Sequence, residues 1–252
     1  LKKFNKAKII TITNVLAHID NINDVIKNIK IILDNKGVLI IEVPYIMDML
    51  KNGTFDLVYH EHLSYLGVTS IKNLLIKNKL KIIDIKKLKI GASGPSIRIY
   101  ATHKKFMIKE KIIVKKFLSY ESKFKIKNVK NYKKFGIIVK KKIEDLKKKL
   151  IKLNDKNISL ACYTAPAKGN TLLNALNLKK KIFSFVTENN KRKINKYTPG
   201  THIKIVNDNY LLKSKVKYAL LLSWNYKKFF IENSKFVQKG GKFILPFGKW
   251  VI

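Results

Sequence analysis

The chain has 252 residues, 46% of them hydrophobic, so it can build one sizeable core or two modest domains. Its formal net charge of +38 first suggests a nucleic-acid partner. However, only Arg98 and Arg192 among the 54 basic residues are arginine, and the lysines are spread along the whole chain. Because specific base and phosphate contacts favour the planar fork of arginine, we expect weak, salt-sensitive binding to polyanions and no specific nucleic-acid partner.

The composition also limits the cellular setting. The longest apolar runs, residues 37–43 and 218–224, are too short to span a bilayer, so we expect no membrane partner. Cys162 is the only cysteine, so neither an intramolecular disulfide nor a cysteine zinc cluster can form within the chain. We therefore expect a cytoplasmic protein. The chain opens on Leu1 and enters a strand almost at once, which we interpret as a fragment of a longer protein.

The first elements predict a parallel α/β sheet. A short β-branched run at residues 8–13 indicates a buried strand, and residues 22–33 carry apolar side chains at helical spacing. We expect this helix to end at residues 35–37, where a glycine follows Asn and Lys. Residues 38–43 then indicate a second buried strand. Two strands around one helix form a βαβ unit, which makes the two strands parallel.

Residues 55–65 follow this second strand and concentrate titratable side chains. Two of the five histidines in the chain, His60 and His62, lie here beside a carboxylate and two phenols. A loop that leaves a strand end is where α/β proteins keep their chemistry. If the stretch is extended, His60 and His62 share one face. If it is helical, His62 shares a face with Tyr59 and with Tyr65.

Three interpretations of residues 55–65 stay open at this point. The first is structural, a neutral histidine that is hydrogen-bonded within a loop. The second is a metal site, which is weaker because His60-x-His62 offers two ligands and no third ligand is obvious. The third is a general base whose tautomer is fixed by a neighbouring group.

A helix and a hairpin are predicted to complete the first array. Residues 69–79 have a helical pattern, and residues 81–88 and 96–102 indicate strands around a glycine-rich turn at 91–95. We expect this hairpin to be antiparallel and to lie at the edge of the sheet. The lysine-rich residues 104–156 then predict two helices, broken near residues 128–131, as a connector that marks a domain boundary.

A second α/β array follows the connector. Its predicted strands and helices alternate, with strands at 158–163, 181–187, 217–223 and 242–246 and helices at 171–176 and 226–237. This order predicts a second, small Rossmann-like sheet. No G-x-G-x-x-G pattern occurs anywhere in the chain, so the usual glycine-rich cradle for a nucleotide cofactor is missing.

The first strand-to-helix turn of this second array, residues 164–171, is a candidate anion site. A helix N-terminus offers free N–H groups and the positive end of the helix dipole, and Lys168 adds charge. Asn170 and Thr171 can donate to phosphate oxygens. On its own, however, the pattern is explained more simply by an ordinary capped turn. Residues 198–202 are likewise explained by a tight turn around Pro-Gly.

Several of these stretches together resemble the sugar C-methyltransferase family, whose members use S-adenosylmethionine to methylate a carbon of a nucleotide-linked keto sugar. The stretch Phe-Asp-Leu-Val-Tyr-His-Glu-His-Leu-Ser-Tyr at residues 55–65 is similar to the central motif of that family. The other similar stretches follow in the family's order, at residues 14–18, 41–45, 164–174, 197–203, 221–225 and 240–244. The resemblance extends from about Ile9 to the end of the chain.

The resemblance implies an α/β fold in two parts. Residues 1–103 would be the C-terminal half of a class I methyltransferase Rossmann-like sheet, and residues 104–252 the helical connector with a second small Rossmann-like domain. The other half of the sheet, with the glycine-rich cofactor loop, and a cysteine-rich zinc domain would lie upstream. We therefore expect no zinc in this chain, an apolar sheet edge, poor binding of S-adenosylmethionine and no turnover by the chain alone.

The resemblance also implies a mechanism. The residue His62 would be the general base that removes the acidic proton beside the ketone of the sugar. Tyr59 and Glu61 would assist it, and the resulting enolate would attack the methyl group of S-adenosylmethionine. These residue types suit the chemistry, because an imidazole titrates near neutral pH and a phenol can donate to a developing oxyanion.

Ligand contacts are implied in the same way. Asn14 and His18 would border S-adenosylmethionine. The nucleotide-linked sugar would contact Tyr45, Lys168, Gly169, Asn170, Thr171 and His202. One departure is Thr164, which stands where the family usually has glycine and which we expect to alter the turn. The alternative to an enzyme is a non-enzymatic module that binds nucleotide sugars or polyanions.

Overall fold

The computed structural model describes residues 5–88, 94–178 and 182–247 and divides into two compact units. Unit 1 comprises Leu1–Asn52 and His60–Lys134, and unit 2 comprises Gly53–Tyr59 and Phe135–Ile252. The short segment Gly53–Tyr59, which opens the histidine-rich stretch, thus belongs to unit 2. The domain boundary predicted between residues 103 and 104 stays a prediction.

Unit 1 is built on a four-stranded sheet in the order β1-β2-β4-β3. The strands are β1 (Ala7–Thr13), β2 (Leu33–Pro44), β3 (Leu80–Leu88) and β4 (Ser96–His103). β1 and β2 are parallel, which confirms the predicted βαβ unit. β4 is antiparallel to both β2 and β3, which confirms the predicted hairpin and places β3 at the edge. Part of the predicted turn at residues 91–95 lies outside the described residues.

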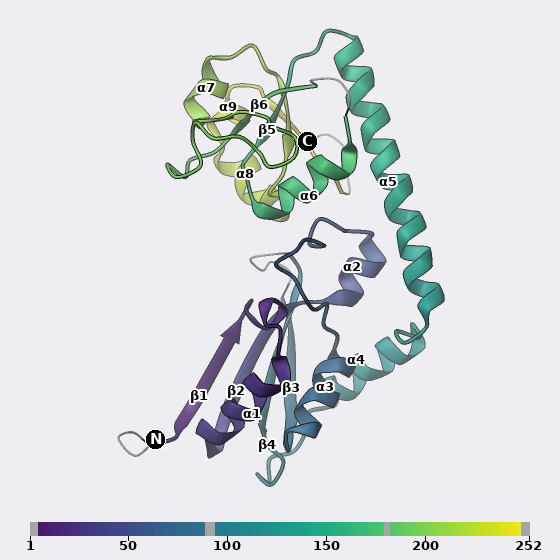
Figure 1. Cartoon of the computed structure of the whole chain (residues 1–252), viewed down its shortest axis with the longest axis vertical. Helices are drawn as coiled ribbons and strands as arrows, with labels where there is room; N and C mark the ends of the chain where they lie inside the picture. The colour runs from purple at the N-terminus through teal and green to yellow at the C-terminus, as the bar shows by residue number, and fades with distance from the viewer. Residues whose placement is uncertain (1–4, 89–93, 179–181, 248–252) are drawn as a thin grey trace. The chain divides into compact units, whose positions relative to one another are not determined.

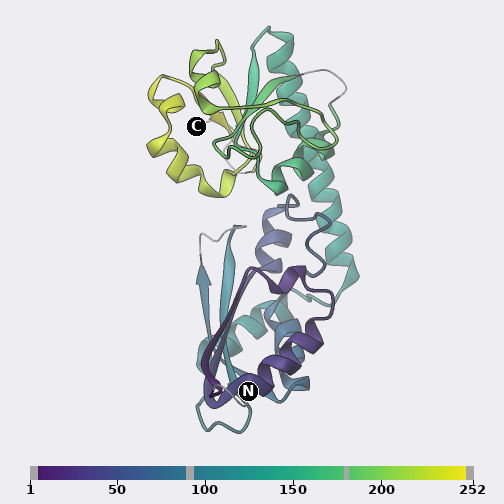
Figure 2. The same ribbon diagram turned by 60° about the vertical axis from the view of Figure 1, so that its left-hand side comes forward.

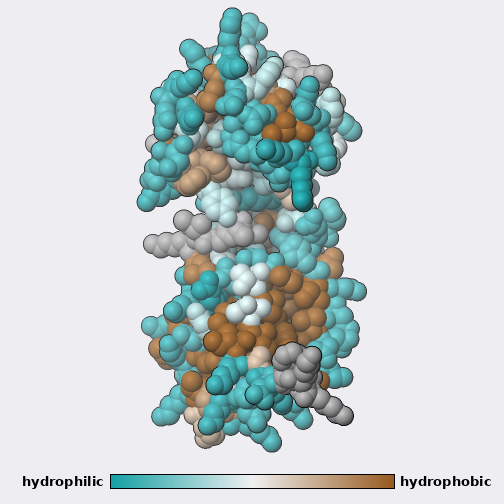
Figure 3. Space-filling view, turned by 90° about the vertical axis from the view of Figure 1, so that its left-hand side faces the viewer, coloured by the Kyte–Doolittle hydropathy of each residue, from teal (hydrophilic) through white to brown (hydrophobic). Residues whose placement is uncertain are grey.

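Helices cover one face of this sheet (Figures 1 and 2). They are α1 (Ile22–Ile32), α3 (Val68–Lys77) and α4 (Ile112–Lys123), while η1 (Leu16–His18) and α2 (Ile46–Asn52) follow the ends of β1 and β2. On the other face Ile9 is 65% exposed, and Val38 and Ile40 are half-buried. Figure 3 shows a broad hydrophobic area on unit 1. The strand alternation therefore leaves apolar side chains on a face that no described helix of this unit covers.

The predicted helix end at residues 35–37 is wrong. α1 ends at Ile32, and β2 begins immediately at Leu33. Gly37 lies inside β2, where a Cβ would come within 2.9 Å of the carbonyl oxygen of Ala7. Its glycine is required by close backbone approach within the sheet and not by a helix C-terminus.

Unit 2 is a five-stranded, all-parallel sheet in the order β7-β6-β5-β8-β9. The strands are β5 (Leu160–Tyr163), β6 (Phe183–Thr187), β7 (Ile205–Val206), β8 (Tyr218–Leu221) and β9 (Lys242–Ile244). The helices are α5 (Val129–Asp155), of which the first residues belong to unit 1, α6 (Ala167–Leu176), α7 (Asp208–Lys213), α8 (Lys227–Asn233) and α9 (Lys235–Gln238), with η2 (Trp224–Tyr226) before α8. The parallel sheet confirms the predicted second α/β array, although β7 and α7 were not predicted.

Two apolar cores sandwich the sheet of unit 2. Leu160 and Cys162 of β5 pack with α5 and α6, whereas Ala161 and Tyr163 pack with α7 and α9. The chain builds β6 and β7 on one side of β5 and then crosses over to build β8 and β9 on the other. The topological switch point therefore lies between β5 and β8. In open α/β sheets this is where ligands bind, outside the carboxyl ends of the strands.

Two further predictions in unit 2 need correction. The helix predicted over residues 226–237 is broken at Ser234, which has an extended backbone and accepts a hydrogen bond from the Phe236 N–H to cap α9. α6 begins at Ala167, four residues earlier than predicted, and Pro166, with an extended backbone, is its N-cap. Lys168 and Gly169 are therefore helical.

None of the helices within residues 5–88, 94–178 and 182–247 is both long and apolar enough to cross a membrane.

Candidate functional site

The histidine-rich stretch is a loop of turns, so neither the extended nor the helical alternative is correct. His62 is only 8% exposed, whereas His60 and Glu61 are exposed. The alternation of burial arises because the loop folds back on η1, where Leu63 and Ser64 donate backbone hydrogen bonds to the carbonyl oxygen of Ala17, at 2.8 and 3.2 Å. These bonds lie inside unit 1 and fix the backbone beside His62.

His62 lies in an aromatic cluster with His18 and Tyr65. The ring centroids of His18 and His62 are 4.8 Å apart in an edge-on arrangement, and those of His62 and Tyr65 are 6.4 Å apart. His18 ends η1, the short turn that leaves the carboxyl end of β1. The structure thus brings together His62, a predicted catalytic residue, and His18, a predicted cofactor contact, at the carboxyl end of a parallel strand.

Asn14 offers an orphaned acceptor at the same strand end. Its backbone takes a left-handed conformation (φ 54°), and its N–H donates to the carbonyl oxygen of Glu42 at 2.8 Å. Its side-chain oxygen Oδ1 is buried and accepts no hydrogen bond within the described chain. A buried acceptor without a partner costs free energy unless a ligand donor fills the position. Asn14 therefore fits the amino or hydroxyl group of a cofactor such as S-adenosylmethionine.

Tyr45, a predicted substrate contact, follows β2 and is buried in unit 1. Its ring packs edge-on against Phe117 of α4, with ring centroids 5.7 Å apart. Burial, followed by the negative charge of Glu121, raises the pKa of its hydroxyl far above the ordinary value. Tyr45 thus stays protonated at any physiological pH, and its role toward a substrate stays a prediction.

In unit 2, the predicted anion-site lysine has partners inside the protein. Lys168 is 6% exposed, and its Nζ donates to Oδ1 of Asn225 at 2.5 Å and lies 3.8 Å from Oδ2 of Asp56. The ammonium also lies 4.6 Å from the ring centroid of Trp224. Burial lowers the pKa of Lys168 to about 8, and the charge of Asp56 opposes this shift.

Asp56 completes this group. It is 1% exposed, and Oδ2 accepts a 2.6 Å hydrogen bond from the indole N–H of Trp224. Burial raises the pKa of the Asp56 carboxyl, while the charge of Lys168 and the Trp224 hydrogen bond oppose the rise. We did not single out Asp56 from the sequence. The available signal was an isolated acid in the apolar run of residues 55–58, in a chain with only 16 acidic residues.

The remaining residues of the predicted anion site lie on α6. Gly169 is tightly packed, since a Cβ there would lie 3.0 Å from the Leu222 side chain that follows β8. Asn170 and Thr171 are half-buried in the first turns of the helix. His202 is exposed, in the turn that Asn174 ties to α6 through a 3.1 Å bond to the Pro199 carbonyl oxygen. The roles of these residues as substrate contacts stay predictions.

Thr164 occupies the turn after β5 with φ 66°, a conformation that is costly for a β-branched residue. Its Oγ1 lies 2.6 Å from the Tyr163 carbonyl oxygen and 2.8 Å from Oγ of Ser223, and it accepts a hydrogen bond from the Ser223 N–H at 3.1 Å. Thr164 therefore keeps a backbone conformation that suits glycine and offsets part of the strain by joining the ends of β5 and β8.

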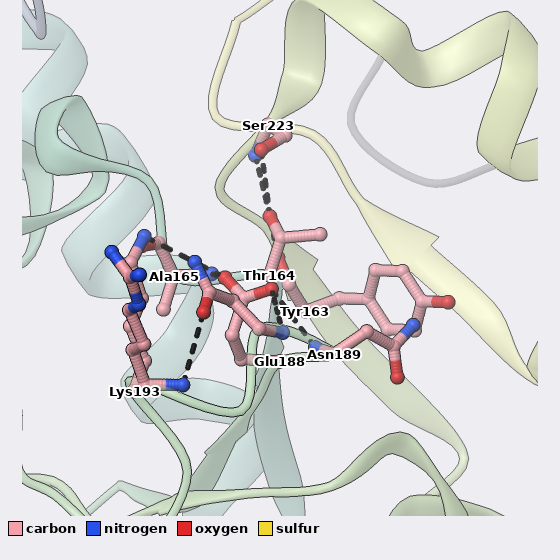
Figure 4. A network of polar contacts seen from close by, with 9 residues as sticks. Tyr163, Thr164, Ala165, Glu188, Asn189, Lys193 and Ser223 are labelled. Carbon is pink, nitrogen blue, oxygen red and sulfur yellow. Dashed lines mark hydrogen bonds and ion pairs between the residues drawn. The ribbon is translucent and has the colours of Figure 1, made fainter.

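Glu188, directly after β6, holds the same turn from the other side (Figure 4). Its carboxylate accepts from the N–H of Ala165 at 3.1 Å and from that of Asn189 at 2.9 Å. Lys193 lies 3.8 Å from it and donates to the Ala165 carbonyl oxygen at 2.7 Å. Dinucleotide-binding folds place a ribose-binding acid at this point of the sheet. In this protein the acid instead bonds the β5 turn, a role that sequence reasoning missed.

No group of three or more His, Cys, Asp or Glu side chains that could hold a metal ion occurs among the described residues.

Comparisons with known proteins identify the family of this chain. Residues 91–247, more than half of the chain, match the C-methyltransferase C-terminal domain, and the protein therefore belongs to the C-methyltransferase family. C-methyltransferase NovU from Streptomyces niveus is 29% identical over 231 residues, which are 91% of this chain and 54% of NovU. The chain thus spans about half the length of this curated relative.

A solved structure, that of the mitomycin 7-O-methyltransferase MmcR, aligns with 39% of this chain and 30% of that chain at 15% identity. Its TM-score of 0.31 is too low to support any argument about function.

Proposed function

We propose that this chain is the substrate-side part of an S-adenosylmethionine-dependent C-methyltransferase that acts on a nucleotide-linked keto sugar, with His62 as the general base. The family match and the similarity to NovU support C-methyl transfer. The observation that carries the assignment of the base is the burial of His62 beside His18 at the carboxyl end of β1.

The chemistry requires a proton to leave a carbon beside a ketone. His62 takes this proton and becomes an imidazolium, while the electron pair moves onto the ketone oxygen to form an enolate. The backbone bonds of Leu63 and Ser64 to Ala17 hold the histidine in place, which favours proton transfer by orientation. Tyr59 donates to the enolate oxygen, and Glu61 assists the base.

When bound, S-adenosylmethionine would supply a methyl group from its sulfonium sulfur, which would be left as a neutral thioether, while the enolate electrons would form the new carbon–carbon bond and restore the ketone. Asn14 and His18 are the residues of this chain that would hold it, and the orphaned Oδ1 of Asn14 would accept one of its donors. The nucleotide part of the substrate would contact α6 through Gly169, Asn170 and Thr171, with Tyr45 and His202 as further contacts. Because Lys168 already contacts Asn225 and Asp56, it would contribute charge and not a free ligand.

Exchange of the sugar's α-proton with solvent deuterium tests the base without methyl transfer. With a nucleoside-diphosphate keto sugar as probe, His62→Ala should slow exchange by roughly two to four orders of magnitude, because general-base catalysis contributes about that much. His60→Ala is the matched control, since this neighbouring histidine is exposed, and it should exchange at nearly the wild-type rate. Wild-type exchange in His62→Ala would remove His62 from the role.

A further inference from the structure

The segment Gly53–Tyr59 is held inside unit 2, although its neighbours in the sequence belong to unit 1. Phe55 lies in the core on the α5 and α6 side, with its ring centroid 5.9 Å from that of Phe247. Trp224 packs against the same Phe247 ring at 5.1 Å. An apolar anchor therefore places the next residue, Asp56, among groups that follow β5 and β8.

The carboxylate of Asp56 lies at the switch point of the unit 2 sheet. Lys168 lies in α6, the helix after β5, and Trp224 begins η2, the short helix after β8, so the two partners of Asp56 follow the two strands between which the order reverses. Open α/β sheets bind ligands at this point. Here one ammonium at 3.8 Å and one indole N–H at 2.6 Å meet a carboxylate of the chain itself.

We propose that Asp56 is a positioning residue for the methyl-transfer site, and that it acts by docking the segment Gly53–Tyr59 onto unit 2 through Trp224 and Lys168. This inference rests on the proposed function, since Tyr59 is one of its predicted catalytic residues. Asp56 touches no reacting atom. It acts through the backbone, where Val58 N–H donates to the Phe55 carbonyl oxygen at 2.8 Å and Tyr59 N–H donates to that of Leu57 at 3.2 Å.

These short-range bonds make the segment a compact turn, so that a fixed Asp56 fixes Tyr59 three residues later. Removing one partner of the Asp56–Lys168 pair is more unfavourable than releasing both. Removing the carboxylate leaves the buried Lys168 ammonium with the Asn225 amide as its one close polar partner among the described residues, and a buried charge without its counter-charge is strongly unfavourable. The segment should therefore detach as a whole when Asp56 loses its side chain.

Hydrogen–deuterium exchange on the full chain tests the docking without any substrate. In Asp56→Ala the amides of residues 53–59 should exchange at least about ten-fold faster, while those of β5 and β8 keep their protection. Asp84→Asn is the matched control, because it removes another Asp–Lys pair, to Lys111 at 2.7 Å, outside unit 2. If Asp56→Ala loosens β5 and β8 as well, the milder Asp56→Asn replaces it.

Deuterium exchange at the sugar's α-carbon tests the positioning. Asp56→Asn should lower kcat about 100-fold with KM within roughly three-fold, since misplacing a catalytic group by about 1 Å costs that much. Asp56→Glu, which keeps the charge, should recover part of kcat. Unchanged amide exchange at residues 53–59, or an unchanged kcat after the segment is released, would overturn the proposal. A full-length wild-type enzyme that does not exchange the sugar's α-proton would refute the proposed function, while amide exchange would still decide the docking.

Discussion

At the scale of single residues, the pKa values of Asp56 and Lys168 show that burial outweighs the attraction between the two charges. Each partner favours the charged form of the other, but for both groups burial is the larger influence, so that the pKa of Asp56 is raised and that of Lys168 is lowered to about 8. A buried ion pair of this kind contributes little net stability, because desolvation offsets the Coulomb gain. The pair therefore determines where the segment Gly53–Tyr59 docks, and it adds little to the free energy of unfolding of unit 2.

This shift predicts a pH dependence in the alkaline range. Unfolded chains keep the lysine proton up to the ordinary pKa of 10.5, whereas folded unit 2 loses it near 8. Between these values the unfolded state binds more protons, so the free energy of unfolding should rise with pH, by about 1–3 kcal/mol. Urea denaturation followed by Trp224 fluorescence, in a Trp250→Phe background, measures this rise. Lys168→Met should abolish the rise, and the control Lys193→Met should keep it. If the rise persists in Lys168→Met, a group other than Lys168 causes it.

At the scale of elements, α3 depends on a cap supplied by another helix. Glu121 of α4 is fully buried, and its carboxylate accepts from the N–H groups of Val68 and Thr69 at 2.7 and 2.8 Å. These are two of the N–H groups that a helix start leaves without an internal partner, and the helix dipole favours an acid there. Gly67 leaves room for it, since a Cβ would lie 2.9 Å from Oε1.

Glu121→Gln should therefore lower the free energy of unfolding of unit 1 by about 1–3 kcal/mol, because it removes a buried charge-assisted cap and turns one acceptor into a donor. Chemical denaturation together with amide exchange in α3 measures the loss. Glu144→Gln, an exposed change on α5, is the control and should lie within about 0.5 kcal/mol of wild type. Equal stability of the two variants would show that the cap contributes nothing.

At the scale of the whole molecule, the positive charge determines how the protein binds polyanions. The positive charge is almost entirely lysine. In unit 1, a cavity of about 990 Å³ is lined by Lys6, Lys30, Lys36, Lys79, Lys104 and Lys105 among other residues. Arg98, one of the two arginines, is engaged by Glu42, which accepts from its NH2 group at 2.7 Å.

Binding to DNA or heparin should accordingly be non-specific and dependent on salt. We expect the logarithm of the affinity to fall linearly with the logarithm of the salt concentration, because binding releases counterions from the polyanion. Two duplexes of unrelated sequence, titrated at several salt concentrations, should give the same affinity and the same slope. A preference for one sequence that survives high salt would contradict this expectation.

Several patterns confined to neighbouring residues were read correctly from the sequence. The β-branched run of β1, the helical spacing of α1 and the turn-bounded hairpin of β3 and β4 follow from local periodicity, which acts within a few residues. The parallel pairing of β1 with β2 and the parallel sheet of unit 2 follow from the alternation of strands and helices. The C-methyltransferase family was also evident from motifs that occur in order along the chain.

Only the tertiary structure decided which distant groups meet. The bond between Trp224 and Asp56 joins residues 168 positions apart, and the cap of α3 joins residues 53 positions apart. Nothing in local periodicity encodes such pairs, because they depend on how whole elements pack. The same reason explains Gly37, which looks like a helix end in the sequence and proves to be a strand position without room for a side chain. It also explains Lys168, whose charge looks free in the sequence and is bound within the fold by a carboxylate from a remote segment.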